Sequence, residues 1–391
     1  MDLETFRWLL GDDGQALLAE ASDLVAGGAD ALAAGSALRR TTTAERAAAA
    51  LTQVMLRERA AAKFGDLAPR LYFTPDALEQ ATRFRVAEHR AGRAAAFGAR
   101  TLIDLGCGIG GDLMAAARTG MICAGVDLDP VRVAIAEANL AALGLTGAVQ
   151  VADATTVLHE TFDLAFADPA RRSGAGRSFR VEDWTPPWEW VQGLLARDAC
   201  VKVAPGIPHS LVPDGVEAEW VSDDGEVKEA ALWAGRTATA RRRATVIGDG
   251  GLATVTDEED PGPAAVGVRA VGAYLYEPDG AVVRAGLVTA VAATLGAGLL
   301  DERIAYVTGD NAFRTPFARG YRVLEELPYR EKQLKAALRE RGVGRLTIKK
   351  RGVEVVPETL RKRLALSGDA EATIVLTRVA GEGTALLVEP L

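Results

Sequence analysis

Hydrophobic residues in the middle of the chain occur in short runs that alternate with longer segments of helical spacing. Between about residues 100 and 248 each run has the length of a strand, and the first, Thr101-Leu-Ile, is followed by an alanine-rich segment. This alternation predicts a parallel sheet whose strands are joined by crossover helices. Strands are predicted at residues 101–103, 122–126, 149–153, 163–168, 200–204 and 216–221, and at 230–233 or 244–247.

The first 97 residues are rich in alanine and leucine. Phe6, Leu9 and Leu10 have helical spacing, so this region is predicted to be all-helical. The helices are interrupted before Thr74, which with the following proline can cap and start a further helix over residues 75–97. That helix carries five basic residues, which form either a solvated face or a face turned toward a substrate: Arg83, Arg85, His89, Arg90 and Arg93.

The C-terminal third differs in composition and in charge. Residues 257–263 are acidic and contain prolines and a glycine, which predicts a linker and a domain boundary. Residues 314–363 hold 15 lysines and arginines against 6 acidic residues, a net charge of +9 within a chain of −8. The pattern predicts a buried helix at 285–300, helices at 332–341 and 357–364, a strand at 345–350 and a final strand at 372–379.

A glycine-rich motif follows the first predicted strand: Asp104-Leu-Gly-Cys-Gly-Ile-Gly-Gly111. Its alternate glycines, Gly106, Gly108 and Gly110, allow a tight turn and let a ligand approach bare main chain. Sixteen residues beyond the motif, the second run ends in Asp127, where a carboxylate can accept hydrogen bonds from ribose hydroxyls. The two features together predict a site for a planar, nucleoside-like ligand.

The order acid-x-Gly-x-Gly-x-Gly differs from the Gly-x-Gly-x-x-Gly fingerprint of dinucleotide sites. It resembles motif I of the class I S-adenosylmethionine-dependent methyltransferases. The resemblance implies that the cofactor is S-adenosylmethionine, whose sulfonium and ammonium groups would be attracted by Asp104. It also implies that Asp153, at the end of the third predicted strand, contacts the adenine amino group. The competing interpretation is an ordinary doubly wound sheet with incidental glycines.

The fourth predicted strand ends in Asp168-Pro169-Ala170-Arg171-Arg172, where the methyltransferase family keeps its catalytic motif. In amino-directed members, that motif is Asp/Asn/Ser-Pro-Pro followed by an aromatic residue. Its polar side chain and a backbone carbonyl accept hydrogen bonds from the target amino group, roles that the resemblance assigns to Asp168 and to the Pro169 carbonyl. The sequence departs from the motif after Pro169. Arg171 and Arg172 are predicted to stack on a base or to hold a phosphate, or else to pair with carboxylates.

The loop after this motif, residues 173–188, interleaves glycines and arginines with aromatic residues. Phe179 or Trp184 can supply a stacking platform for a base, whereas Trp184 and Trp188 can equally be packing residues. Farther along, Glu226 is either a general base or part of a hairpin turn. The loop contains no cysteine for a covalent route to carbon methylation, and direct transfer to an amine needs mainly alignment.

Segments of the C-terminal region resemble the THUMP-like domain that is fused to a class I methyltransferase domain in bacterial proteins. They are residues 342–353, 361–364 and 372–378, and together with residues 72–81 they extend the likeness over nearly the whole chain. THUMP domains proper present RNA to modifying enzymes, so the resemblance implies an RNA partner. Six basic residues form either a face that neutralises phosphates or a solvated surface on a small structural domain: Lys349, Lys350, Arg351, Arg361, Lys362 and Arg363.

The sequence thus predicts an α/β protein of three parts. They are an N-terminal helical region (1–97), a Rossmann-like class I methyltransferase domain (98–256) and an α+β THUMP-like domain (264–391). The predicted reaction is methyl transfer from S-adenosylmethionine to a base in structured RNA, either tRNA or rRNA. Two alternatives stay open: a small-molecule methyltransferase, and a non-catalytic RNA-binding protein that retains the cofactor site.

The remaining sequence features bear on location and on metals. Cys107, Cys123 and Cys200 are isolated, which argues against a disulfide framework and against a zinc cluster. The first residues lack the basic start of a secretory signal, and the longest uncharged stretch has 16 residues, too few to span a bilayer. We therefore expect a cytoplasmic protein with no membrane segment and no metal site.

Overall fold

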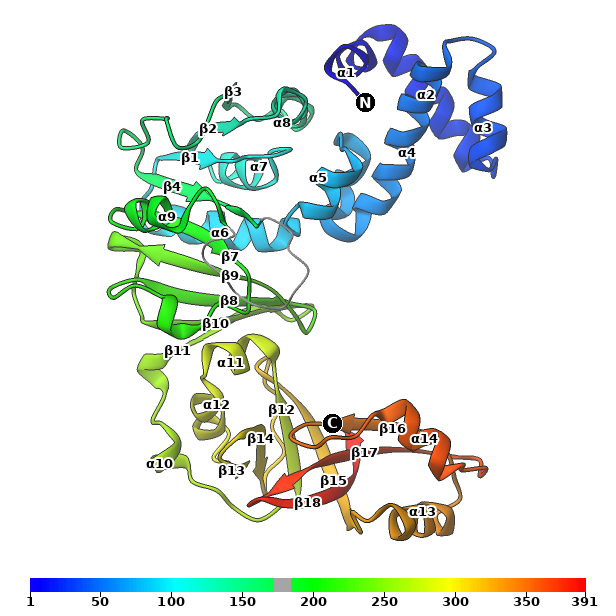
Figure 1. Cartoon of the computed structure of the whole chain (residues 1–391), viewed down its shortest axis with the longest axis vertical. Helices are drawn as coiled ribbons and strands as arrows, with labels where there is room; N and C mark the ends of the chain where they lie inside the picture. The colour runs from blue at the N-terminus through cyan, green and yellow to red at the C-terminus, as the bar shows by residue number, and fades with distance from the viewer. Residues whose placement is uncertain (172–183) are drawn as a thin grey trace. The chain divides into compact units, whose positions relative to one another are not determined.

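The computed structural model describes residues 1–171 and 184–391 (Figure 1). The chain forms two compact units. The first comprises Met1–Val216 with Ala231–Thr239, and the second comprises Glu217–Ala230 with Ala240–Leu391. The predicted domain boundaries at residues 97 and 256–264 stay predictions. Within the described residues, no helix is both long and apolar enough to cross a membrane.

The first unit begins with a set of alanine-rich helices. Phe6 of the first helix and Phe64 of the fourth lie in the same hydrophobic core as Leu164 and Phe166 of the sheet, so helices and sheet share one interior. The elements are α1 (Leu3–Leu10), α2 (Asp12–Ala26), α3 (Ala31–Leu38), α4 (Ala44–Phe64), the 3₁₀ helix η1 (Gly65–Arg70), α5 (Pro75–Gln80) and α6 (Phe84–Ala96).

The single helix predicted over residues 75–97 is wrong, because the structure has α5 and α6 with a break at residues 81–83. Thr74 does cap α5, accepting a hydrogen bond from the backbone of Ala77, with a proline in the first turn. The Lys63 ammonium donates to the carbonyl oxygens of Leu78, Glu79 and Ala81 at 2.6–2.9 Å. These bonds satisfy acceptors at the end of α5, so the chain can leave the helix there.

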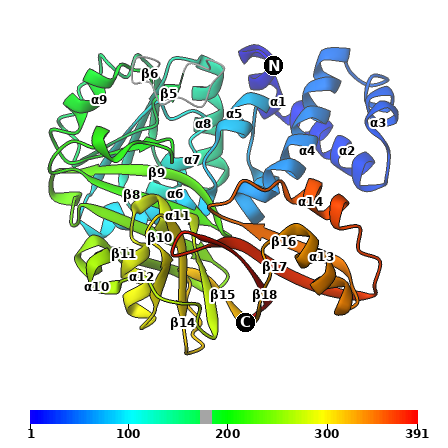
Figure 2. The same ribbon diagram turned by 60° about the horizontal axis from the view of Figure 1, so that its bottom comes forward.

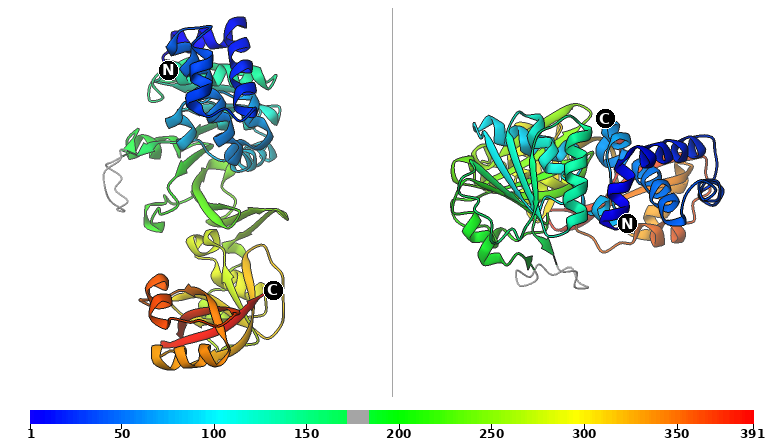
Figure 3. Two further views of the ribbon diagram at one scale, coloured as in Figure 1. Left: turned by 90° about the vertical axis from the view of Figure 1, so that its right-hand side faces the viewer. Right: turned by 90° about the horizontal axis from the view of Figure 1, so that it is seen from above.

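The sheet of the first unit is parallel over its five sequential strands. These are β1 (Thr101–Leu105), β2 (Ile122–Asp127), β3 (Ala148–Val151), β4 (Leu164–Ala167) and β7 (Ala199–Val203). Their order is β7-β4-β1-β2-β3, and each neighbouring pair is parallel. The C-terminal part of β9 (Glu226–Ala234) lies beside β7. Figure 3 shows these strands side by side, and because all four pairs are parallel their carboxyl ends lie at one edge of the sheet.

Helices cover this sheet where the apolar pattern requires it. They are α7 (Gly111–Arg118), α8 (Pro130–Ala142) and α9 (Trp188–Leu194). Helix α7 contacts β1, β2 and α6, and α8 contacts β2, β3 and α1. A two-stranded ribbon, β5 (Ala170–Arg171) with β6 (Trp184–Thr185), follows the fourth strand. Helix α7 begins at Gly111, at the end of the glycine motif, so its packing on β1 and β2 holds that motif beside the sheet.

The second unit begins with four neighbouring strands. They are β8 (Glu217–Asp223), the N-terminal part of β9, β10 (Arg242–Gly248) and β11 (Gly251–Thr256), in the order β11-β10-β8-β9. The turn between β8 and β9 has Asp224 and Gly225 at φ 53° and 77°, as a tight hairpin requires. Because β8 and β9 are neighbours joined by this turn, the hairpin interpretation of the segment is confirmed. Glu226 is the first residue of β9 and forms an ion pair with Lys228.

A seven-stranded sheet completes the second unit. Its strands are β12 (Tyr274–Pro278), β13 (Gly298–Asp301), β14 (Ile304–Gly309), β15 (Ala318–Leu327), β16 (Val343–Lys350), β17 (Ala370–Val379) and β18 (Glu382–Pro390), in the order β13-β14-β12-β15-β18-β17-β16. The helices of this unit are η5 (Asp257–Glu259), α10 (Pro263–Val266), α11 (Gly280–Ala285), α12 (Val288–Thr294), α13 (Glu331–Glu340) and α14 (Pro357–Leu364). Ile374 and Leu376 of β17 pack against α13 and α14, whereas Val375 between them packs on the opposite face, so both faces are covered. Figure 2 shows α13 and α14 beside β16. Two further 3₁₀ helices, η3 (His209–Leu211) and η4 (Gly235–Thr237), belong to the first unit.

Two sequence predictions for this region are wrong. The helix predicted at 285–300 is instead the end of α11, the short helix α12 and the strand β13. Gly286 and Gly296 have φ values of 69° and 58°, a left-handed backbone that ends each helix. The strand at 372–379 is not the last one, because β18 follows it after a turn and pairs with it in antiparallel fashion.

Candidate active site

The glycine turn between β1 and α7 leaves its main chain open. Gly106, Gly108 and Gly110 have φ values of 108°, 54° and 82°, which side-chain-bearing residues rarely adopt. A Cβ added at Gly106 or Gly108 would meet no atom within 4 Å, whereas one at Gly110 would lie 3.2 Å from the Cβ of Ala136 in α8. The first two glycines therefore provide space for a ligand, and the third allows close packing of the helices.

Asp127 ends β2 beside this turn and is almost fully buried. Its Oδ2 accepts a hydrogen bond from the Gly108 amide at 2.9 Å, and its Oδ1 accepts one from the Asp129 amide at 2.9 Å. The glycine turn therefore fixes the orientation of the carboxylate. Each oxygen has further acceptor capacity, which suits the pair of ribose hydroxyls predicted from the sequence.

Asp104 lies in the last part of β1 and is 1% exposed. Its Oδ1 has no hydrogen-bond partner among the described residues. Burial, and then repulsion from Asp168, raise the pKa of Asp104 to about 8, although Arg90 and Lys202 act in the opposite direction. A buried carboxyl with an unpaired oxygen, next to an open glycine turn, fits a ligand that carries positive charge.

Asp153 follows β3 and is exposed. Its Oδ1 accepts hydrogen bonds from the backbone amide of Thr155 at 2.8 Å and from the Thr155 hydroxyl at 2.7 Å. These bonds lower the pKa of Asp153, so it is ionised at neutral pH. The side chain is thus held in an Asx-type turn at the carboxyl edge of the sheet, and its predicted contact with adenine stays a prediction.

Asp168 follows β4 and forms an ion pair that the sequence analysis did not predict. The Lys202 ammonium, in β7, donates to Asp168 Oδ2 at 2.6 Å and to the Thr82 hydroxyl at 3.0 Å. Lys202 is mostly buried, with 16% of its side chain exposed, while 37% of Asp168 is exposed. The ammonium therefore holds one carboxylate oxygen, and the partly exposed Asp168 retains acceptor capacity for another donor.

The basic helix α6 does not form one solvated face. Arg90 is 5% exposed, forms an ion pair with Asp112 of α7 and lies 4.5 Å above the ring of Phe166. Arg93 donates to the Thr237 carbonyl oxygen at 3.0 Å. These two side chains hold α6 against the rest of the first unit, so neither of the alternatives drawn from the sequence describes them.

The glycine turn is also tied to the N-terminal helices. Asn139 of α8 is fully buried, and its amide nitrogen donates to the carbonyl oxygens of Ile109 at 2.9 Å and of Tyr72 at 3.1 Å. Its oxygen accepts from the Tyr72 amide at 2.7 Å. The next residue, Phe73, exchanges backbone hydrogen bonds with the buried side chain of Gln53 in α4. The buried side-chain amides of Asn139 and Gln53 thus link the glycine turn to the N-terminal helices.

The structure describes Trp184, predicted either to stack on a base or to pack, and Trp188, predicted to pack. Trp184 is buried and meets Trp188 edge to face, with ring centroids 5.1 Å apart, as packing residues do. Arg171 lies in β5, at the start of this ribbon. Arg172 and Phe179 lie outside the described residues, so the roles predicted for them stay predictions.

The six basic residues of the C-terminal region do not all share one environment. Lys349 forms an ion pair with Glu277 at 2.6 Å, and Arg351 donates to the Ala305 carbonyl oxygen at 2.9 Å. The others are exposed: Lys350, Arg361, which donates to the Leu346 carbonyl oxygen at 3.0 Å, Lys362, and Arg363, which pairs with Glu331 at 3.0 Å. Lys349 and Lys350 are consecutive in β16, so they point to opposite faces of the sheet.

Models of protein families match three parts of the chain. A methyltransferase domain matches residues 103–169, which contain the glycine turn, Asp127 and Asp168. A THUMP domain-like model matches residues 318–390, and a domain of unknown function matches residues 2–60. The first two matches fall where the sequence resemblances were found.

Similar proteins cover most of the chain. Uncharacterized S-adenosylmethionine-dependent methyltransferases from two strains of Mycobacterium tuberculosis are 40% identical over 354 residues, 87% of this chain and 95% of their own. A crystal structure of a proposed methyltransferase from Porphyromonas gingivalis W83 superposes with a TM-score of 0.73 at 21% identity, covering 99% of this chain and 97% of that one. This structural likeness shows that the two proteins share a fold.

Proposed function

We propose that this chain, which belongs to the S-adenosylmethionine-dependent methyltransferases and carries a THUMP-like region, methylates a base in structured RNA, either tRNA or rRNA. The observation that carries the proposal is Asp168, a partly exposed carboxylate held by Lys202 beside the buried acid of the glycine turn. Membership of the family establishes the cofactor and the reaction type. The RNA substrate is the proposed part, and a methyl-transfer assay with RNA tests it.

The residues of the turn fit the cofactor. S-adenosylmethionine supplies an electrophilic methyl group on a positively charged sulfur. Asp104, with its unpaired buried oxygen, can supply a negative charge by releasing its proton when such a group binds, and Gly106 and Gly108 offer open main chain. Asp127 is oriented by the Gly108 amide so that it can accept from the ribose hydroxyls. Asp153 is proposed to accept from the adenine amino group.

The acceptor side of the reaction depends on Asp168 and the Pro169 carbonyl. Lys202 fixes one oxygen of Asp168, so the carboxylate has a defined orientation in which it can accept a hydrogen bond from an amino group of the base. Holding the nitrogen in line with the methyl group supplies most of what direct transfer needs. The Arg171 and Arg172 guanidinium groups are proposed to hold the nucleotide.

The sequence contains no cysteine in residues 169–183, and the described cysteines are unsuited to nucleophilic attack. Cys107, Cys123 and Cys200 are buried and free. Burial raises the pKa of the Cys123 thiol to about 12 and raises that of Cys107 as well. These features favour transfer to nitrogen over a cysteine-dependent route to carbon. They also accord with a reducing compartment, and we place the reaction in the cytoplasm.

The RNA assignment is supported by the THUMP-like match and by the charge of the C-terminal region. Residues 314–363 have a net charge of +9, and Lys350 and Lys362 are exposed there. Exposed cations of this kind bind phosphates through counterion release. The basic residues Lys349, Arg351, Arg361 and Arg363 are proposed to contribute to the same contact.

The test is to incubate the protein with radiolabelled S-adenosylmethionine and total RNA, and to compare Asp168→Ala with the matched control Asp23→Ala, an exposed acid in α2. We expect labelled RNA with the natural protein and the control, and loss of label with Asp168→Ala. Cofactor binding by calorimetry should survive in Asp168→Ala and weaken in Asp127→Ala. Labelling of small molecules but not RNA, or RNA binding without any transfer, would reject the proposal in favour of one of the two alternatives.

A further inference from the structure

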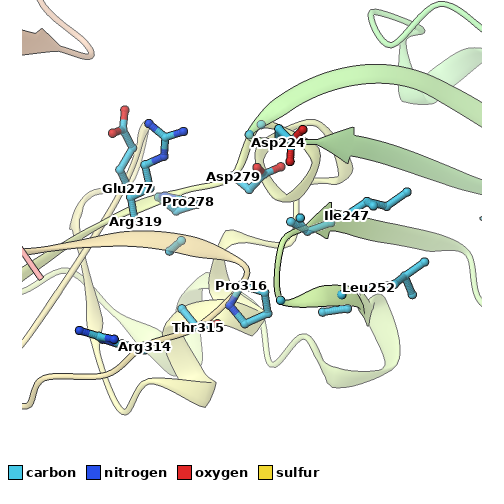
Figure 4. A pocket seen from close by; sticks show the side chains of 18 of the residues that line it. Asp224, Ile247, Leu252, Glu277, Pro278, Asp279, Arg314, Thr315, Pro316 and Arg319 are labelled. Atoms are coloured by element: carbon cyan, nitrogen blue, oxygen red, sulfur yellow. The ribbon is translucent and has the colours of Figure 1, made fainter. Parts of the chain in front are cut away.

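The second unit contains a pocket of about 740 Å³ that has no assigned role. Five segments line it: the β8–β9 turn, the β10–β11 hairpin, the junction of β12 with α11, the stretch 314–319 at the start of β15, and the end of β16 (Figure 4). Its volume lies within the usual range for small-molecule sites, roughly 300–1,000 Å³. The pocket is therefore large enough for a ligand the size of a nucleotide.

Four cationic side chains line this pocket, and they differ in how they are held. Arg314 and Arg319 are exposed, and neither side chain has a hydrogen bond or an ion pair with any residue that the structure describes. Arg319 packs against Gly225, since its NH2 lies 2.7 Å from where a Cβ on that glycine would stand. Arg351 donates one N–H to the Ala305 carbonyl oxygen, which leaves its other donors available.

Three carboxylates also line the pocket, and two of them are engaged locally. Glu277 accepts from the Lys349 ammonium at 2.6 Å and from the Tyr321 hydroxyl at 3.3 Å. Asp279 accepts from the Ala281 amide at 2.8 Å and so caps α11. The third, Asp224, lies in the β8–β9 turn. Four cationic side chains against three carboxylates leave the lining with a net charge of +1, and neither Arg314 nor Arg319 forms an ion pair with a carboxylate that the structure describes.

The opposite wall of the pocket exposes main chain. Gly250, at the tip of the β10–β11 hairpin, is exposed there, and a Cβ added to it would meet no atom within 4 Å, whereas Gly248 and Gly251 pair with each other across the hairpin. Main chain that is this accessible lets an anion approach backbone amides closely. Leu252 and Pro316 add apolar surface beside it. Guanidinium groups on one side and bare main chain on the other form a setting for phosphate oxygens.

We propose that this pocket binds the phosphate group of a nucleotide. The nucleotide is either part of an RNA chain or a free phosphorylated compound, and the two sources share the same chemistry. Only the RNA source rests on the proposed function. Arg314 and Arg319 make the charged contacts with the phosphate, Arg351 contributes from the end of β16, and the apolar wall takes the remainder of the ligand.

The experiment uses the full chain and three probes: pyrophosphate, adenosine 5′-monophosphate with adenosine as its unphosphorylated control, and a fluorescently labelled RNA stem-loop. The variant Arg314→Ala with Arg319→Ala is compared with Arg40→Ala with Arg59→Ala, two exposed arginines that lie outside the pocket and outside the basic C-terminal region. Calorimetry measures the small probes and fluorescence anisotropy measures the RNA. Because each charged hydrogen bond changes affinity by about tenfold or more, the pocket variant should lose about a hundredfold for phosphate.

The outcomes separate the two sources. Loss of both pyrophosphate and RNA binding in the pocket variant alone supports a phosphate site on the path of the RNA. Loss of monophosphate binding with unchanged RNA binding supports a site for a free phosphorylated compound, even if the RNA assignment fails. Equal effects of the two variants on phosphate binding, equal affinity for adenosine and its monophosphate, or no phosphate binding by the natural chain would overturn the proposal.

Discussion

Replacing Asp104 by asparagine keeps the shape of the side chain and removes its ability to ionise. In the natural chain the carboxyl is 1% exposed, and burial together with Asp168 raises its pKa from 3.8 to about 8. Between these two values the folded chain retains a proton that the unfolded chain releases. Stability therefore falls as the pH rises through this window, and the loss is complete above the folded pKa.

The magnitude follows from the size of the window. A shift from 3.8 to about 8 corresponds to at most about 6 kcal/mol of stability lost between pH 4 and pH 8, since each unit is worth about 1.4 kcal/mol. The asparagine variant lacks this titration. We expect the difference between the free energies of unfolding of variant and natural chain to shift by several kcal/mol in favour of the variant as the pH rises from 4 to 8.

Binding of S-adenosylmethionine should show the opposite trend. Its positive charge favours the ionised form of Asp104, so binding releases a proton and the affinity of the natural chain should rise by up to about tenfold per unit between pH 6 and pH 8. In the variant, the affinity should be weaker and nearly independent of pH.

Two measurements check both halves of this prediction. Denaturant unfolding at several pH values gives the stability difference, and calorimetry in two buffers of different ionisation enthalpy counts the released protons. If the variant followed the natural chain at every pH in both measurements, a buried, protonated Asp104 could not be the acid that faces the cofactor.

The other predictions concern the acceptor group, the glycine turn and the C-terminal fold. Lys202→Met should lower the methyl-transfer rate at saturating cofactor about 10- to 100-fold, because Asp168 loses its 2.6 Å partner. Lys202→Arg should recover part of the rate, and an equal loss in both variants would contradict an orienting role. Gly108→Ala should weaken cofactor binding about tenfold or more in calorimetry. Gly144→Ala is the control, because Gly144 has a similar positive φ and a Cβ there would meet no atom within 4 Å; it should lower stability through backbone strain and leave cofactor affinity unchanged. Gly344→Ala should lower the unfolding temperature sharply in a thermal melt, since its Cβ would stand 1.6 Å from a carbonyl oxygen, and an unchanged melt would show that β16 can shift freely.

The parts of the fold that follow from local pattern were predictable. The strands before Gly106 and Asp127 are apolar runs of the right length, and the structure has them as β1 and β2. The glycine spacing identified the family because it reflects a fixed backbone path next to the ligand, with φ values that only glycine adopts readily. The helix over residues 357–364 was predicted to the residue, since a proline starts it and apolar Leu360 and Leu364 lie one turn apart.

The parts that depend on contacts between distant residues were not predictable. Lys202 meets Asp168 across 34 residues of sequence, and Arg90 meets Asp112 across 22. Lys202 did leave a signal, because it is the one charged residue in the otherwise apolar strand Ala199–Val203. A charge in such a strand requires a partner at the sheet edge. The breaks at residues 81–83 and at Gly286 were missed because helical composition continues across them.

The buried Asn139 sets a lower limit on the size of the catalytic fragment. Its side chain bonds at once to Ile109 in the turn and to Tyr72 upstream of the sheet, and the neighbouring Phe73 is held by Gln53. A protein trimmed to begin at the first strand would lack Tyr72, Phe73 and Gln53, and the Asn139 side chain would lose both of its hydrogen bonds to Tyr72. The shortest fragment that keeps the glycine turn in this conformation should therefore begin no later than the middle of α4. A fragment that contains the sheet alone is expected to lose the shape of the turn.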